Sequence, residues 1–149
     1  MRLDPDCLRD VLCCVEDNTG LHKRCIFIDC SMSGALSDAL GTRQPELAVY
    51  QKELMERYDS DSILYHLRYC VEDELVVEGR KQSSGMMIIL DLMPKGHQFI
   101  AQIRDSGQWK KVKNGLDAVR NYSLAAISAV AEGVTSAGIS AYFSGKANH

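Results

Sequence analysis

The chain has 149 residues, 46% of them hydrophobic, which is enough for about one soluble domain with a buried core. Its formal net charge is -3, whereas dedicated nucleic-acid binders usually carry a basic excess, so the composition disfavours tight binding to phosphate. Six cysteines occur without a Cys-x-x-Cys pair, which predicts reduced thiols and no metal site. The N-terminal residues contain no apolar segment, so we expect no secretory signal and a cytoplasmic protein.

The first predicted helix runs from Pro5 to Asp17, because Asp4 is a good N-cap and proline suits the first helical position. Residues 24–30, RCIFIDC, are β-branched and aromatic in the middle and too short for a helix, so they predict a strand that pairs with residues 86–90. Residues 31–44 are rich in Ser, Gly, Ala and Thr without a clear period, which indicates a surface insert.

Proline and capping residues place a second helix at Pro45 to Tyr58 and a third at Asp61 to Val71. Strands at 75–78 and 86–90 enclose a turn that contains glycine, and a fourth helix runs from Pro94 to Arg104. This order is typical of a winged helix-turn-helix, an α+β fold with a small antiparallel sheet. We therefore expect a winged-helix domain over residues 1–105.

Residues 106–149 are predicted to form a C-terminal helical extension, with basic charge concentrated in residues 109–120. The segment from Ser123 to Phe143 has a single charge but is rich in Ala, Ser and Gly, which makes it a poor membrane span. Small residues recur every four positions and allow two helices to approach closely. We expect a homodimer through this segment, and the alternative is a helix folded back on its own domain. The residues of the small stripe are Ala129, Gly133, Ala137 and Ala141.

The outward side of the third helix and the turn between the last two strands are the candidate contacts to double-stranded DNA. Acidic residues at 59, 61, 72, 73, 74 and 78 flank these positions and favour the alternative of a solvated face or a protein contact surface. The candidates are Ser62, Tyr65, His66, Arg68 and Tyr69 on the helix, and Arg80 and Lys81 in the turn.

Catalytic motifs are absent: no G-x-x-x-x-G-K, H-E-x-x-H or G-x-S-x-G occurs. Cys13 and Cys14 are adjacent on a helix and point about 100° apart, so they predict separate thiols rather than a metal or redox site. We expect His97 to be a packed or capping residue, because no carboxylate, Ser or Cys stands at a spacing typical of catalysis. We expect no enzyme, no catalytic residues and no cofactor.

Four segments together resemble, in order, the landmarks of an uncharacterised domain-of-unknown-function family of bacteria and their phages. They are MRLDPDCLRDVL, YHLRYCVEDELV, LMPKGHQFIAQIRDSGQWKKVK and SLAAISAVAEG. The resemblance covers most of the chain and implies a winged-helix fold, without catalytic residues or a known ligand. Glu74 stands where that family usually has Gly, and Met93 where it usually has Thr, so the turn and the helix cap at these positions should be weakened.

The function expected from these patterns is a non-enzymatic winged-helix protein that binds DNA or regulates transcription, with a phage-borne origin in keeping with the resemblance. The alternative is a protein-interaction adaptor or oligomerisation module that keeps the fold without binding DNA.

Overall fold

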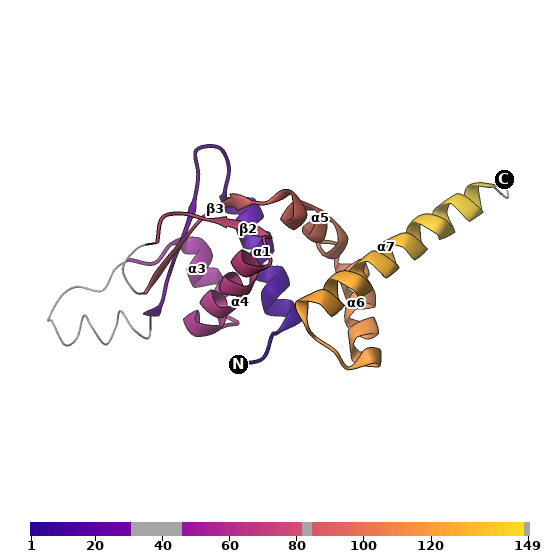
Figure 1. Ribbon diagram of the computed structural model, residues 1–149, viewed down its shortest axis with the longest axis horizontal. Helices are drawn as coiled ribbons and strands as arrows, with labels where there is room; N and C mark the ends of the chain where they lie inside the picture. Colours follow the sequence, from indigo (N-terminus) through magenta and orange to yellow (C-terminus); the bar gives the residue numbers. More distant parts are fainter. Residues whose placement is uncertain (31–45, 82–84, 148–149) are drawn as a thin grey trace, which may run out of the picture.

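The computed structural model describes residues 1–30, 46–81 and 85–147, which form six helices and a three-stranded antiparallel sheet (Figure 1). The α+β class is therefore confirmed. The elements are α1 (Pro5–Asn18), β1 (Cys25–Ile28), α3 (Val49–Leu54), α4 (Ser60–Glu72), β2 (Val76–Glu78), β3 (Met86–Leu92), α5 (Pro94–Ile103), α6 (Ser106–Val119) and α7 (Leu124–Ala147).

Helix α1 begins where the sequence predicts. The Asp4 carboxylate accepts hydrogen bonds from the backbone N–H groups of Asp6, at 2.9 Å, and Cys7, at 3.4 Å, and Pro5 occupies the first turn. One side of the helix is fully buried, because its apolar residues recur at helical spacing. These buried residues are Cys7, Leu8, Val11, Leu12 and Val15.

The sheet has the strand order β1-β3-β2, so the last strand in the chain lies in the middle. Strand β1 pairs with β3 from Cys25 opposite Ile89 to Ile28 opposite Met86, which confirms the pairing expected between residues 24–30 and 86–90. Strand β2 pairs with the other side of β3, with a register shift after Val77.

Two side chains of α3 cover the outer edge of β1. The Tyr50 hydroxyl accepts from the backbone N–H of Ile26 at 2.7 Å and lies 3.2 Å from its carbonyl oxygen. The buried Gln51 amide accepts from the N–H of Ile28 at 2.9 Å and donates to its carbonyl at 2.7 Å. The backbone groups of this edge strand are therefore satisfied without another strand.

Helix α3 is shorter than the predicted helix from Pro45 to Tyr58. It begins at Val49 after Ala48, which makes no side-chain cap, and residues 55–58 form turns rather than helix. Pro45 and the expected insert at 31–44 lie outside the described residues.

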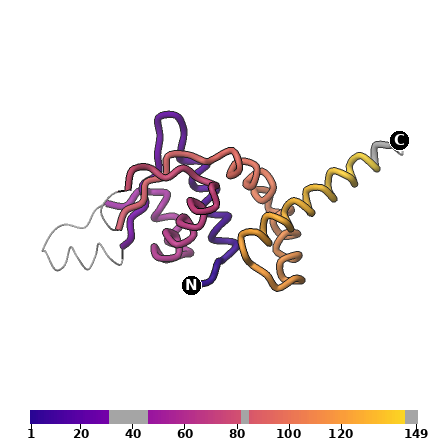
Figure 2. The backbone as a smooth tube through the Cα atoms, viewed as in Figure 1, coloured from indigo at the N-terminus to yellow at the C-terminus, as the bar shows by residue number. Residues whose placement is uncertain are grey.

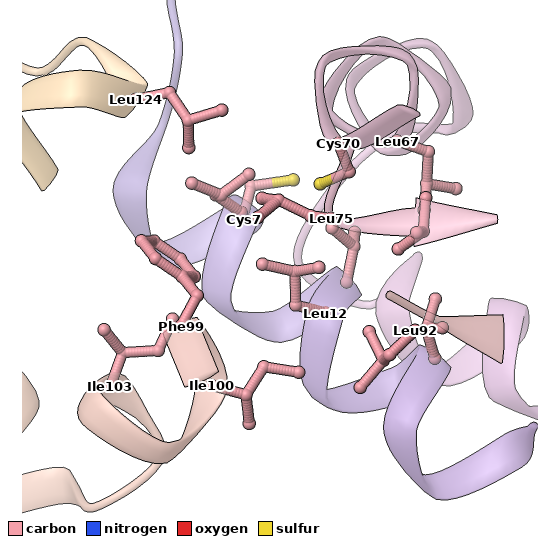
Figure 3. Packing of buried hydrophobic residues seen from close by; sticks show 14 of the residues in the cluster. Cys7, Leu12, Leu67, Cys70, Leu75, Leu92, Phe99, Ile100, Ile103 and Leu124 are labelled. Atoms are coloured by element: carbon pink, nitrogen blue, oxygen red, sulfur yellow. The ribbon is translucent and has the colours of Figure 1, made fainter. Parts of the chain in front are cut away.

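Helices α1, α4 and α5 and the inner side of the sheet enclose one apolar core (Figure 3). The sulfur atoms of Cys7 on α1 and Cys70 on α4 point toward each other in this core. Burial raises the pKa of the Cys7 thiol to about 12, and burial also raises the pKa of Cys70. All six cysteines are free thiols, as the spacing predicted.

The turn from α4 to β2 and the start of α5 lie against each other. Helix α4 closes with hydrogen bonds from Glu74 N–H to the Val71 carbonyl at 3.1 Å and from Leu75 N–H to the Cys70 carbonyl at 2.8 Å. Glu74 takes a left-handed φ of 59°, a conformation that favours glycine. Met93 is the N-cap of α5 and forms no side-chain cap. Glu74 therefore stands at a position whose backbone conformation favours glycine, and Met93 stands at an N-cap position that a threonine would cap.

Helices α6 and α7 follow the body of the molecule, and α7 extends away from it (Figure 2). Trp109, Val112 and Leu116 of α6 are buried in the same cluster as the residues of α1 and α5. The domain boundary expected at 105/106 stays a prediction, although the core continues across it.

Candidate nucleic-acid interface

Helix α4 is fixed at its start by Asp59, whose carboxylate accepts from the Ser62 backbone N–H at 2.7 Å. Hydrogen bonding from the Ser62 backbone and side chain lowers the pKa of Asp59. The helix buries Ile63, Leu67 and Cys70 in the core, so its other side is left to face outward.

His66 does not belong to that outward side, which corrects the expectation for this residue. Its side chain is only 1% exposed. Its Nε2 accepts from the Asp4 backbone N–H at 2.8 Å, so Nδ1 must carry the proton and donate to the Ser62 carbonyl at 2.7 Å. His66 therefore ties the N-terminal segment to α4, and both of its nitrogens are occupied.

Tyr65, Arg68 and Tyr69 lie together on the outward side of α4. The two tyrosine ring centroids are 5.1 Å apart and their hydroxyls 3.4 Å apart, and this hydrogen bond raises the pKa of Tyr65. The Arg68 guanidinium lies 5.2 Å from the centre of the Tyr65 ring and 4.0 Å from the Glu72 carboxylate. Ser62, the remaining candidate on α4, is half-buried.

The hairpin between β2 and β3 carries the other two candidates, Arg80 and Lys81, both of which are exposed. The described part of the hairpin is held by a bond from Gly79 N–H to the Ile88 carbonyl at 2.8 Å. At its far end Gly85 has a φ of 98°, and its carbonyl accepts from the Asp29 N–H at 2.8 Å.

A shallow cavity of about 390 Å³ joins the outward side of α4 to this end of the sheet. The cavity brings Tyr65 and Arg68 beside the end of the sheet and the first residue of the chain, whereas Arg80 and Lys81 do not line it. The Tyr65 hydroxyl donates to the Met1 carbonyl at 2.9 Å and so holds the exposed Arg2 nearby. The cavity is lined by Met1, Asp29, Asp61, Leu64, Tyr65, Arg68 and Met87.

Sequence reasoning missed the N-terminal arm of this surface. The contacts of Met1 with Tyr65 and of Asp4 with His66 join residues more than 60 positions apart. A periodic sequence pattern cannot predict such pairs. Only the presence of a polar His on an otherwise apolar helix side could have suggested a buried partner.

Further cations lie outside this surface. Lys110 and Lys111 are exposed on α6, which confirms that the basic cluster of residues 109–120 is separate from α4. Lys95, next to the end of α4, is paired with Asp73 at 3.2 Å. His97 is exposed and lies 3.8 Å from Glu16, so the expected packed or capping role is wrong.

Metal binding and membrane crossing are two further possibilities for the described part of the chain. It contains no group of three or more His, Cys, Asp or Glu side chains placed to hold a metal ion. One helix, Leu124–Ser144, is long and apolar enough to cross a membrane by length and composition, although such a helix also occurs in proteins that cross none.

Comparison with known proteins places most of the chain in a family. A family model described as "Hypothetical protein (DUF2513)" matches residues 2–122, which include every element from α1 to α6. No curated protein and no solved structure matches the chain significantly. The model covers far more than half of the sequence, and the chain therefore belongs to the DUF2513 family of hypothetical proteins.

Proposed function

We propose that this chain is a winged-helix protein that binds double-stranded DNA through α4 and the β2–β3 hairpin. The observation that carries the proposal is the topology. In the described parts of the chain, a helix, a strand, two helices and two strands occur in this order before α5, and the sheet order is β1-β3-β2. A winged helix-turn-helix has a positioning helix, a recognition helix and a hairpin called the wing. In this chain we assign these roles to α3, α4 and the β2–β3 hairpin.

The closeness of α4 to the end of the sheet from which the hairpin extends supports this assignment. Helix-turn-helix proteins place one helix in the major groove while neighbouring elements contact the backbone. Tyr65 and Arg68 lie on the outward side of α4, and the cavity beside them reaches the end of the sheet from which the hairpin extends. The proposal includes no catalytic residue and no cofactor, and it places the protein in the cytoplasm.

Four exposed cations on α4, the hairpin and the N-terminal segment are proposed to contact phosphates: Arg2, Arg68, Arg80 and Lys81. Arg68 must exchange its exposed Glu72 partner, which costs little because an exposed pair is weak. Four phosphate contacts give a slope of about -3.6 for log affinity against log salt, so a change from about 50 to about 200 mM salt should weaken binding roughly 150-fold. Asp61 and Glu72 oppose the phosphates, so we expect the affinity itself to be modest.

The test is a fluorescence anisotropy titration of a random duplex of about 20 base pairs at these two salt concentrations. The double variant Arg80→Ala/Lys81→Ala should reduce the fold loss between the two salts to roughly 12, because two contacts are removed. The double variant Lys110→Ala/Lys111→Ala on α6 is the matched control and should keep the wild-type slope. Absence of binding at the lower salt, or equal effects of the two double variants, would contradict the proposal.

A second candidate function rests on the same side chains. Tyrosine and arginine dominate the energetic centres of protein interfaces, and here Tyr65, Arg68 and Tyr69 stack within a rim that includes Asp61 and Glu72. A protein-interaction adaptor would use this surface without phosphate. In the titration above, it corresponds to no DNA affinity at either salt concentration.

A further inference from the structure

Cys14 of α1 and Cys25, the first residue of β1, form a pair of thiols. Their side chains are hydrogen-bonded to each other. Cys25 is fully buried in the apolar core, and Cys14 is half-buried and packs against this core from its edge. The partner of Cys14 therefore comes from another element of the fold and not from its sequence neighbour, Cys13.

Two polar side chains contact the sulfur atoms of this pair. The Asn18 amide donates to the Cys14 sulfur at 3.8 Å and to the Cys14 carbonyl at 2.8 Å. The Tyr50 hydroxyl is hydrogen-bonded to the Cys25 sulfur. A donor to sulfur stabilises the thiolate more than the neutral thiol. Each sulfur of the pair therefore has a second group beside it that favours negative charge.

The hydrogen bond between the two thiols changes their acidity. It lowers the pKa of Cys25 and raises the pKa of Cys14. The pair therefore loses one proton more readily than a lone buried thiol and holds the other proton firmly. The remaining proton lies between the two sulfurs. Its transfer to Cys25 leaves the thiolate on Cys14, where the Asn18 amide stabilises it.

A cavity of about 230 Å³ gives access to one side of the pair. Cys14 and Tyr50 line this cavity, whereas Cys25 does not line it and is 0% exposed. The cavity is large compared with the roughly 30 Å³ that a water molecule occupies, so it admits a molecule as small as hydrogen peroxide. Such an oxidant meets the sulfur of Cys14 before that of Cys25.

We propose that Cys14 and Cys25 form a peroxide-sensitive redox site, in which Cys14 reacts with hydrogen peroxide and Cys25 converts the product to an intramolecular disulfide. The Cys14 thiolate attacks one peroxide oxygen, the O–O bond breaks, and Cys14 becomes a sulfenic acid. The hydroxide that leaves takes the first proton of the pair and becomes water. The Cys25 sulfur then attacks the Cys14 sulfur, the S–S bond forms and the S–O bond breaks. The second hydroxide leaves with the Cys25 proton, so two thiols are oxidised and one peroxide is reduced to water.

A second pair of thiols supplies an internal control. The sulfur atoms of Cys7 and Cys70 point toward each other in the core (Figure 3), but both residues are 0% exposed. Burial raises the pKa of both thiols. Neither an exposed sulfur nor a stabilised thiolate is present in this pair, so it should stay reduced while Cys14 and Cys25 are oxidised.

The disulfide would join α1 to the start of β1 across a short segment of chain. Closing a short loop removes little entropy from the unfolded state, so the melting temperature of the oxidised protein should rise by roughly 5 °C. A pair that cycles reversibly between dithiol and disulfide is typical of redox sensors inside cells. This chemistry is independent of DNA binding.

Mass spectrometry of the full chain after exposure to a small excess of hydrogen peroxide tests the proposal. The wild type should lose the mass of two hydrogens, and peptide mapping should link Cys14 to Cys25. Cys13→Ser is the matched control, because Cys13 and Cys14 share a tryptic peptide, and it should form the same link. Cys14→Ser should form no link, and dithiothreitol should restore the two hydrogens to the wild type.

Two substitutions of Cys25 separate its two roles. Cys25→Ser keeps a hydrogen-bond donor beside Cys14 but cannot form a disulfide, so Cys14 should stop at the sulfenic acid, which dimedone labels. Cys25→Ala removes the donor as well. It should be labelled about tenfold more slowly, which is the change in thiolate for one unit of pKa. Near-UV circular dichroism checks that both variants are folded.

Three results would overturn the inference. A folded wild type that keeps both hydrogens under peroxide removes the redox site. A link that persists in Cys14→Ser, or one that joins Cys7 to Cys70, assigns the oxidation to other thiols. Equal rates of dimedone labelling in folded Cys25→Ser and Cys25→Ala would show that Cys25 does not activate Cys14.

Discussion

Replacement of Gly96 by alanine should destabilise the protein, although the same change is favourable in most helices. Gly96 is in the first turn of α5 and lies directly over the backbone of Leu75. A Cβ at this position would collide with the Leu75 carbonyl oxygen and lie 3.0 Å from its carbonyl carbon. That oxygen also accepts from the Met93 N–H at 2.8 Å, so it is fixed at the junction of α5 with the turn after α4.

The obstacle is backbone, which cannot rotate away as a side chain does, so overpacking should cost about 3 kcal/mol, the upper part of its usual range. The higher helix propensity of alanine stabilises the variant by about 1 kcal/mol, so the free energy of unfolding should fall by about 2 kcal/mol in total. For a chain of this size, the melting temperature should fall by about 4–8 °C.

Urea denaturation followed by far-UV circular dichroism measures this change. The matched control is Gly133→Ala, also in a helix but with open space around the added Cβ. It should stabilise by about 0.5–1 kcal/mol. If Gly96→Ala is as stable as the wild type, the close packing of α5 on Leu75 is wrong.

Three further changes test local chemistry by the same denaturation assay. Glu74→Gly should stabilise by about 1 kcal/mol, because glycine adopts the left-handed φ without strain; a loss of stability would contradict this conformation. Met93→Thr should add about 1 kcal/mol by supplying the missing cap of α5, and no gain would mean that the N-terminal N–H groups are already satisfied. Asp59→Ala should cost about 1 kcal/mol at neutral pH. Because folding lowers the pKa of Asp59, this cost should disappear as the pH falls below about 4, and a cost independent of pH would refute the cap.

Elements with strong local signals could be predicted closely from the sequence. Helix α1 has a capping Asp, a proline and a regular apolar face, and its predicted end is one residue from the observed one. Strand β1 was predicted from its β-branched and aromatic residues, and its expected pairing with β3 is observed. The predicted start of α3 at Pro45 rested on the proline alone, and the structure begins this helix at Val49.

The candidate site was less predictable, because its side chains are placed by contacts distant in the sequence. Tyr65 and His66 are neighbours on α4, yet one faces outward and the other is buried under the N-terminal segment. Helical spacing put His66 at the edge of the outward face, and only the position of Asp4 decides on which side of that edge it lies. The exposure of the distal part of α7 could not be predicted either, since the sequence does not show at which residue α7 stops packing against α6.

The covered edge of β1 links two parts of the molecule that would otherwise move separately. Tyr50 and Gln51 of α3 supply the donors and acceptors that a fourth strand would supply, so α3 is bonded to the sheet as well as packed on it. A shift of α3 by even one residue would leave four backbone groups of Ile26 and Ile28 unpaired and ready to bond another chain. The orientation of α3 and the protection of this protein from strand-to-strand aggregation therefore depend on the same two side chains.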